Sequence, residues 1–262
     1  MSICEIFPII ADYTSQGKRV ILVTEYSNIP VRSVFVDGKL IIGSKKYEDL
    51  ALEAEKRGNK IEIERDGTKI VAEVIEPRPS LVLVGSGTIA KEIFKLANAM
   101  GFLVEVVAED AKEEDFPDAK FFSNTLQVIE QLSSNSFVIV ANEGGKPYDI
   151  PAAYLALKSK AKYVGFLSSQ KRAAYTIAQL IKMGIPQEEL KERFYGPMGL
   201  DLNAKTAEEI ALSALSELVL IMRKGSGKHL RDVKDPYLLL KDAMEGKITD
   251  VCNFTPIKVS EK

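Results

Sequence analysis

Leu81-Val-Leu-Val-Gly-Ser-Gly-Thr-Ile-Ala90 is the stretch of sequence that decides the fold. Its first four residues are apolar, which predicts a strand buried on both faces, and apolar residues then recur at helical spacing over residues 89–100. Between them, Gly85 permits a tight turn, Gly87 lets the backbone approach a pyrophosphate, and Ala90 lets the helix pack closely on the strand. The free N–H groups at the helix start favour an anion, so we predict a Rossmann-type nucleotide site. Its predicted contacts are Gly85, Ser86, Gly87, Thr88 and Ile89.

The rest of residues 77–223 repeats this alternation of short apolar strands and amphipathic helices. Strands are predicted at 81–84, 102–107, 137–140 and 163–166, and helices at 89–100, 150–158, 169–183 and 206–222. Thr206 and Glu209 are spaced as a capping box at the start of the last helix. The predicted fold class is therefore α/β, with a Rossmann-like doubly wound parallel sheet covered on both faces.

The sequence pattern of residues 1–76 predicts a separate small domain of mixed α+β structure. Two Asp-Gly pairs, Asp37-Gly38 and Asp66-Gly67, each lie between two short apolar strands. Such a pair predicts the type I′ turn of a β-hairpin. Helical spacing covers residues 3–15 and 47–57. Glu76-Pro-Arg-Pro79 then breaks both periodicities, because proline lacks an N–H and favours extended neighbours. The predicted domains are 1–76, 77–223, and a linker with a C-terminal tail over 224–262, in which Lys224-Gly-Ser-Gly-Lys-His229 is the basic linker.

Charge and composition exclude several classes of function. The 35 Lys and Arg against 37 Asp and Glu leave a net charge of −2, which provides no general attraction for nucleic acid or an anionic membrane. No apolar run reaches the roughly 18 residues of a membrane span, and the N-terminus does not resemble a signal peptide, so we expect a cytoplasmic protein. The chain has two cysteines, Cys4 and Cys252, and one histidine, His229. The usual zinc and iron–sulfur sites and the Cys–His and Ser–His catalytic sites therefore lack some of their residues, and no metal site is expected.

Two further positions are candidate ligand contacts. Glu109 follows the second predicted strand, which ends in Ala108 where such strands usually offer the carboxylate for a ribose. Asn142 follows the strand at 137–140, at the edge where open sheets of this kind bind ligands. The alternatives, a solvated loop charge for Glu109 and a plain turn at Asn142, stay open.

Two downstream segments carry a family resemblance. They are Tyr163-Val-Gly-Phe-Leu-Ser-Ser-Gln-Lys-Arg172 and Pro197-Met-Gly-Leu-Asp-Leu-Asn-Ala-Lys-Thr-Ala-Glu-Glu-Ile-Ala211. Together with the glycine loop they resemble the XdhC/CoxI family, the accessory factors of xanthine dehydrogenase and carbon monoxide dehydrogenase. The resemblance implies a maturation role: binding the molybdenum cofactor (molybdopterin) and delivering it, with its terminal sulfur installed, to a molybdenum hydroxylase apo-enzyme.

The first of these segments also predicts an anion site. Ser168 and Ser169 at a helix start, followed by Lys171 and Arg172, supply donors and positive charge for a phosphate-bearing ligand. Asp201, in the Gly-Leu-Asp turn, is predicted either to orient a ligand or to cap its own turn.

The sequence departs from the family pattern at several positions. Ile42-Gly43-Ser44-Lys45 stands where the family usually has Ser-Gly-Gly-Cys, so no thiol for cofactor sulfur is available there. Thr88 replaces a histidine, Ala108 replaces an aspartate, and Asn142-Glu143 stand where a histidine-containing loop is common.

The sequence is compatible with three functions. The preferred one is an accessory protein that binds its cofactor without catalysis. The second is an NAD(P)-dependent oxidoreductase. Tyr154 and Lys158 have the spacing of the catalytic pair of short-chain dehydrogenases. We interpret them as a packing tyrosine and a solvated lysine, because the longer glycine loop of that family is lacking. The third is a nucleotide-sensing module. The sequence does not separate NAD(P) from the molybdenum cofactor, and it leaves the oligomeric state open, a homodimer included.

Overall fold

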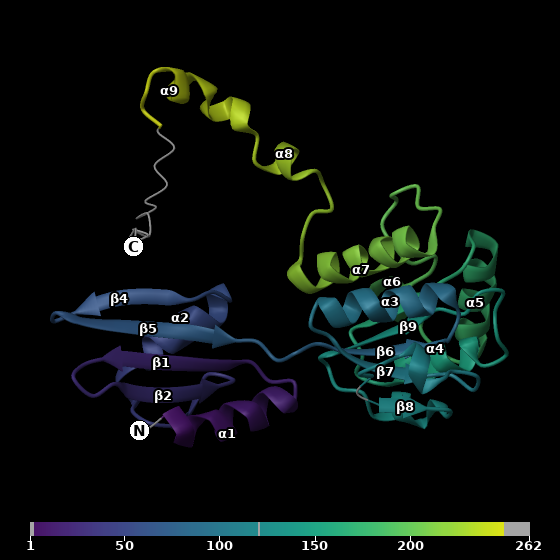
Figure 1. The fold of residues 1–262 in the computed structure, drawn as a ribbon, viewed down its shortest axis with the longest axis horizontal. Coiled ribbons are helices and arrows are strands. Elements are labelled where there is room, and N and C mark those ends of the chain that lie inside the picture. The colour runs from purple at the N-terminus through teal and green to yellow at the C-terminus, as the bar shows by residue number, and fades with distance from the viewer. Residues whose placement is uncertain (1–2, 120, 249–262) are drawn as a thin grey trace, which may run out of the picture. The chain divides into compact units, whose positions relative to one another are not determined.

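The structure, a computed structural model, describes residues 3–119 and 121–248 (Figure 1). The chain forms two compact units, Met1–Val219 and a second that begins at Leu220. Within the first unit the strands divide into two sheets, one formed by β1 to β5 and the other by β6 to β11.

The first sheet is antiparallel, with strand order β3-β2-β1-β5-β4. Its elements are α1 (Ile3–Ser15), β1 (Val20–Tyr26), β2 (Val31–Val36), β3 (Lys39–Ile42), η1 (Lys45–Tyr47), α2 (Glu48–Arg57), β4 (Ile61–Arg65) and β5 (Thr68–Ile75). Ile6 of α1 packs with Val20 and Val34 on one face, while Leu50 of α2 packs with Ile21 on the other. The sheet is therefore covered by one helix on each side, and the mixed α+β structure predicted for this region is confirmed.

Both predicted hairpin turns are present. Asp37 and Asp66 have φ of 50° and 51°, and the glycines that follow them have φ of 71° and 70°. Positive φ at both central residues is the property of a type I′ turn, which matches the right-handed twist of the paired strands.

The second sheet is parallel throughout and has the order β11-β10-β9-β6-β7-β8. Its elements are β6 (Ser80–Val84), α3 (Thr88–Ala99), β7 (Leu103–Val107), η2 (Glu113–Asp115), β8 (Phe121–Ser123), η3 (Leu126–Gln131), β9 (Ser136–Val140), α4 (Asp149–Lys158), β10 (Tyr163–Phe166), α5 (Gln170–Lys182), α6 (Gln187–Arg193), β11 (Phe194–Tyr195) and α7 (Ala207–Arg223). The chain runs outward from β6 to β8, then returns to β9 on the other side of β6. This reversal is the switch point of a Rossmann fold, where the connections diverge and leave a crevice at the carboxyl ends of β6 and β9.

Helices cover both faces of this parallel sheet, as predicted. On one face, Val82, Val138 and Val164 pack with alanines of α4 in a continuous core. On the other, α3 packs on β6 and β7, and the buried Tyr163 donates a hydrogen bond of 2.6 Å to Glu217 of α7. Burial and the adjacent Glu217 carboxylate raise the pKa of Tyr163 well above its usual value, so this phenol is a neutral donor.

The sequence did not predict β8, β11 or α6. The two strands have three and two residues, too few to show a period. Helix α6 is largely charged and buries only Leu190, so it has no apolar stripe. In the second unit, α8 (Leu230–Val233), η4 (Pro236–Leu239) and α9 (Leu240–Met244) also lie in a segment for which no element was predicted, and they bury no residue.

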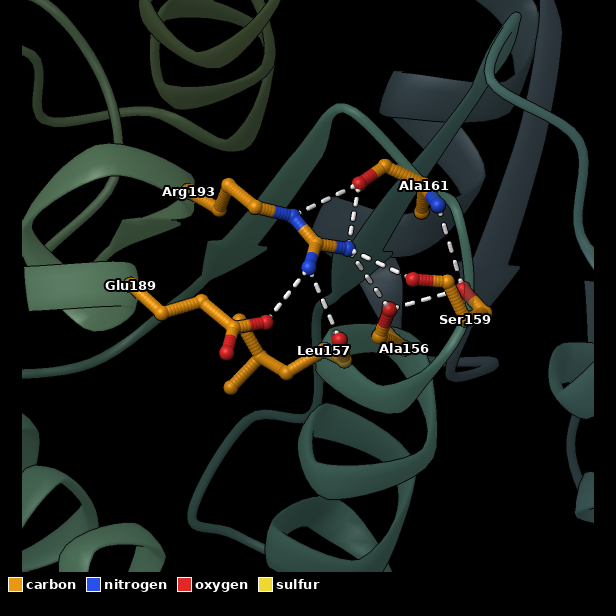
Figure 2. A network of polar contacts seen from close by, with 6 residues as sticks. All are labelled: Ala156, Leu157, Ser159, Ala161, Glu189 and Arg193. Carbon is orange, nitrogen blue, oxygen red and sulfur yellow. Dashed lines mark hydrogen bonds and ion pairs between the residues drawn. The ribbon is translucent and has the colours of Figure 1, made fainter. Parts of the chain in front are cut away.

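Arg193, the last residue of α6, closes the carboxyl end of α4 (Figure 2). Its guanidinium donates to the carbonyl oxygens of Ala156, Leu157, Ser159 and Ala161 at 2.6 to 3.3 Å. It also pairs with Glu189 at 2.6 Å. The last carbonyl groups of a helix have no partner within the helix, and Arg193 supplies hydrogen-bond donors to them. Its positive charge also interacts favourably with the negative end of the helix dipole.

Arg193→Met is expected to lower the free energy of unfolding by about 2 kcal/mol, since it keeps the alkyl stem but leaves several carbonyl groups without their charged donor. Chemical denaturation of the purified variant measures this. Glu189→Gln, which removes only one arm of the network, serves as the control with an expected loss below about 1 kcal/mol. Equal losses in the two variants would contradict the capping role.

Candidate functional site

The crevice at the switch point is shaped by the close approach of two strand ends. Gly85, directly after β6, has φ of 137°, and a side chain there would place its Cβ 2.5 Å from the carbonyl oxygen of Ala141 after β9. Only glycine fits this conformation and this spacing. The tight turn predicted at Gly85 is thus explained by its contact with the neighbouring strand.

The start of α3 faces a carboxylate from across the crevice. Gly87 is the N-cap of α3 and provides no side-chain cap. The Ile89 N–H donates instead to Oε1 of Glu143, in the loop after β9, at 2.7 Å. A Cβ on Gly87 would lie 3.1 Å from the same oxygen, so this carboxylate lies directly over the glycine turn.

Asp110 joins the glycine loop to the loop after β9. The Ser86 hydroxyl donates to Asp110 Oδ1 at 2.6 Å, and Lys146 Nζ lies 3.3 Å from Asp110 Oδ2. The Ser86 hydrogen bond and then the Lys146 ammonium lower the pKa of Asp110, so it stays ionised. Glu109, the predicted ribose contact, is exposed beside it, and its role in ligand binding stays a prediction.

Asp149, the first residue of α4, organises the base of this loop. Its side chain is only 2% exposed, accepts hydrogen bonds from Asn142 Nδ2 at 2.6 Å and Lys146 N at 2.9 Å, and forms an ion pair with Arg172. The Arg172 guanidinium also lies 5.2 Å from the centre of the Phe166 ring. The loop between β9 and α4 is therefore anchored at both ends by one buried carboxylate.

Tyr148 stands next to this cluster. Burial raises the pKa of its phenol, and the nearby carboxylates of Asp110, Asp149 and Glu109 raise it further. The phenol is therefore neutral near pH 7 and available as a hydrogen-bond donor.

A pocket of about 400 Å³ opens beside these groups. It is lined by Ile89, Asn142, Glu143, Gly144, Leu167, Ser168, Ser169 and Arg172. Five of the predicted contacts, Ile89, Asn142, Ser168, Ser169 and Arg172, are thus brought together from the ends of three strands. The Ser169 side chain is the N-cap of α5 and accepts from Arg172 N at 3.3 Å, while the Ser168 hydroxyl donates to the Phe166 carbonyl at 3.4 Å.

The other seven predicted contacts lie outside this lining: Gly85, Ser86, Gly87 and Glu109, which are described above, and Thr88, Lys171 and Asp201. Thr88 and Lys171 are exposed in the first turns of α3 and α5. Asp201 is exposed, and its carboxylate accepts a hydrogen bond of 3.4 Å from Asn203 N, which agrees with the turn-capping alternative. Their contribution to ligand binding remains a prediction.

The segment before α7 is fixed by its own hydrogen bonds. Thr206 Oγ1 accepts from Glu209 N at 3.2 Å and Glu209 Oε2 accepts from Thr206 N at 3.1 Å, which confirms the predicted capping box. Gly199, with φ of 108°, packs against Ser213 so closely that no side chain fits. The Gly-Leu-Asp turn therefore has a structural reason for its glycine.

Four residues of this site were not predicted as contacts from the sequence: Asp110, Glu143, Lys146 and Asp149. None belongs to a recognisable motif, and the only available signal was their position between a predicted strand end and a predicted helix. Within the described ranges, no group of three or more His, Cys, Asp or Glu side chains is placed to hold a metal ion. No helix in those ranges is long and apolar enough to cross a membrane.

Fold and crevice together define a Rossmann-type protein whose glycine loop and pocket meet at the switch point. Residues 81–218, just over half of the chain, match the XdhC Rossmann domain. The chain belongs to the XdhC family, so the resemblance noted in the sequence is confirmed.

Two similar proteins extend the comparison. The uncharacterized protein YqeB of Escherichia coli strain K12 is 26% identical over 159 residues, which cover 57% of this chain and 28% of that protein. This chain therefore spans little more than a quarter of that relative's length. A crystal structure described as a xanthine dehydrogenase from Bacillus halodurans has a TM-score of 0.66 and 19% identity, over 86% of this chain and 68% of the other, and this likeness concerns the fold alone.

Proposed function

We propose that this chain is an accessory protein of a molybdenum hydroxylase of the xanthine dehydrogenase type. It binds a phosphate-bearing cofactor, the molybdenum cofactor or a nucleotide such as NAD(P), in the crevice between β6 and β9 and passes the molybdenum cofactor to the apo-enzyme as cargo. Membership of the XdhC family supports the class of partner.

One observation carries the ligand-binding part of the proposal. The pocket brings the start of α3, through Ile89, together with Ser168, Ser169 and Arg172 at the start of α5. Helix starts offer N–H groups to anions, and a guanidinium recognises phosphate through planar paired donors. The Ile89 N–H is already bonded to Glu143, so a ligand with a phosphate at one end fits best with that phosphate at the start of α5.

The same residues argue for a carrier rather than a catalyst. Asn142, Ser168 and Ser169 are hydrogen-bonding groups, and both nearby carboxylates already have partners, Glu143 in the Ile89 N–H and Asp149 in Arg172. The lining contains no tyrosine, histidine or lysine that could supply the proton for hydride transfer to a carbonyl compound, and the phenol of Tyr148 lies outside it.

Lys171→Ala is expected to weaken binding of the molybdenum cofactor by about one to two orders of magnitude, because a charge-assisted hydrogen bond to phosphate contributes roughly 1.5 to 3 kcal/mol. Titration calorimetry of wild type and variant measures the change. Lys182→Ala, at the exposed last turn of the same helix, is the matched control and should bind as wild type does. Unchanged binding by Lys171→Ala would remove this lysine from the site.

A parallel assay separates the carrier from the oxidoreductase alternative. Oxidation of NADH and NADPH is followed over a panel of aldehydes and ketones with the wild-type protein. The proposal predicts no turnover above background, and a robust rate of hydride transfer would favour the oxidoreductase.

A further inference from the structure

The glycine loop already contacts an anion supplied by the chain itself. Glu143 Oε1 accepts from Ile89 N at 2.7 Å and lies over Gly87. In a Rossmann fold this position, at the start of the first helix and above the second glycine, receives the pyrophosphate of a dinucleotide. The carboxylate of Glu143 therefore takes the hydrogen bond and the favourable dipole that a phosphate would use.

A second contact holds the same loop over the glycine turn. Strand β6 lies between β9 and β7 in the sheet. Lys146, in the loop after β9, reaches Asp110 after β7, so the loop passes over the carboxyl end of β6 where the glycine turn lies. Asp110 in turn accepts the Ser86 hydroxyl of that turn. The two contacts thus attach the loop to the glycine turn and to the far side of the crevice.

The loop has two glycines between fixed ends. Its two ends, Asn142 and Asp149, are buried and bonded to each other. Between the two contact residues lie Gly144 and Gly145, with φ of 72° and 82°, and glycine gives the backbone there its widest choice of conformations. Both Glu143 and Lys146 are exposed, so releasing them buries no charge.

We propose that Glu143 and Lys146 form a two-point latch that closes the pyrophosphate position and decides which ligands enter. A ligand whose phosphate binds at the start of α5 enters the pocket with the latch closed, whereas a dinucleotide has to displace Glu143 from Ile89. The inference rests on the proposed function, because it concerns the specificity of the same crevice.

Glu143→Ala is expected to bind NAD⁺ about tenfold more tightly than wild type, because in the variant NAD⁺ no longer has to displace a carboxylate from the Ile89 N–H. A hydrogen bond to an ionised group changes an equilibrium constant by about a factor of ten or more. Calorimetry with NAD⁺ as the probe measures the change. Glu188→Ala is the control, because Glu188 is likewise an exposed glutamate but lies in the first turn of α6, outside the pocket lining. It should leave the NAD⁺ affinity at the wild-type value.

A second readout requires no ligand. Hydrogen exchange at the Ile89 amide should be about tenfold faster in Glu143→Ala than in wild type, since the variant removes the acceptor of that N–H. Glu188→Ala should leave the rate unchanged. This measurement reports the contact itself and is independent of which cofactor the protein carries.

The latch is overturned by equal NAD⁺ affinity in Glu143→Ala and wild type, by no NAD⁺ binding in the variant, or by unchanged exchange at Ile89. Each of these results leaves the proposed function standing, because that is tested with the molybdenum cofactor. Tighter NAD⁺ binding together with faster Ile89 exchange supports the latch.

Discussion

Gly87→Val is expected to abolish the stabilisation of the protein by its ligand while leaving the ligand-free fold nearly as stable as wild type. In wild type, NAD(P) or a pterin nucleotide at about 100 times its Kd should add roughly 2.7 kcal/mol to the free energy of unfolding. The valine side chain fills the space above the turn that a pyrophosphate would use. Thermal unfolding with and without each ligand measures the difference.

The fold should tolerate this change because the backbone at Gly87 needs no special conformation. Its φ is −70°, and a Cβ there would first meet the flexible end of Glu143, at 3.1 Å. Ala99→Val, at the exposed last residue of α3, is the control and should keep the full ligand-dependent shift. A shift in Gly87→Val as large as that in wild type would place the ligand elsewhere.

Asp149→Ala is expected to lower the free energy of unfolding by about 3 kcal/mol, because removing one member of a buried ion pair leaves the other without its partner. The value lies at the lower end of the usual range since the Arg172 side chain is 29% exposed. The variant also removes the acceptor that orients Asn142 and the Lys146 N–H, so the loop after β9 should lose its order. Chemical denaturation measures the first effect.

Lys146→Ala is the matched comparison for Asp149→Ala. It removes an ion pair whose side chains are 42% and 56% exposed, and such pairs contribute below about 1 kcal/mol. A loss in Asp149→Ala no larger than that in Lys146→Ala would show that the loop is anchored by other contacts.

The parts of the fold that the sequence predicted are those fixed by local chemistry. The Asp-Gly turns need positive φ, the Thr206 and Glu209 pair satisfies a helix start, and the strand of residues 81–84 leads through two glycines into a helix. Each signal lies within a few residues, so one sequence is enough to recognise it.

The residues that escaped prediction act through contacts between distant segments. Glu143 meets Ile89, Asp149 meets Arg172, and Arg193 meets the end of α4, across 54, 23 and 32 to 37 positions of sequence. No local pattern distinguishes these charges from solvated ones. The pocket could be predicted as a place on the sheet, whereas its polar contacts depend on how the loops cross.

The carrier role is tested most directly by reconstitution of a cofactor-free molybdenum hydroxylase of the xanthine dehydrogenase type. The chain is loaded with molybdenum cofactor, freed of unbound cofactor and mixed with the apo-enzyme, and the recovery of hydroxylase activity is followed over time. Recovery should be faster with the loaded wild-type chain than with the same amount of free cofactor, and the gain should be smaller with Lys171→Ala, which is expected to bind the cofactor more weakly. Equal recovery from free cofactor, from wild type and from Lys171→Ala would contradict the carrier role.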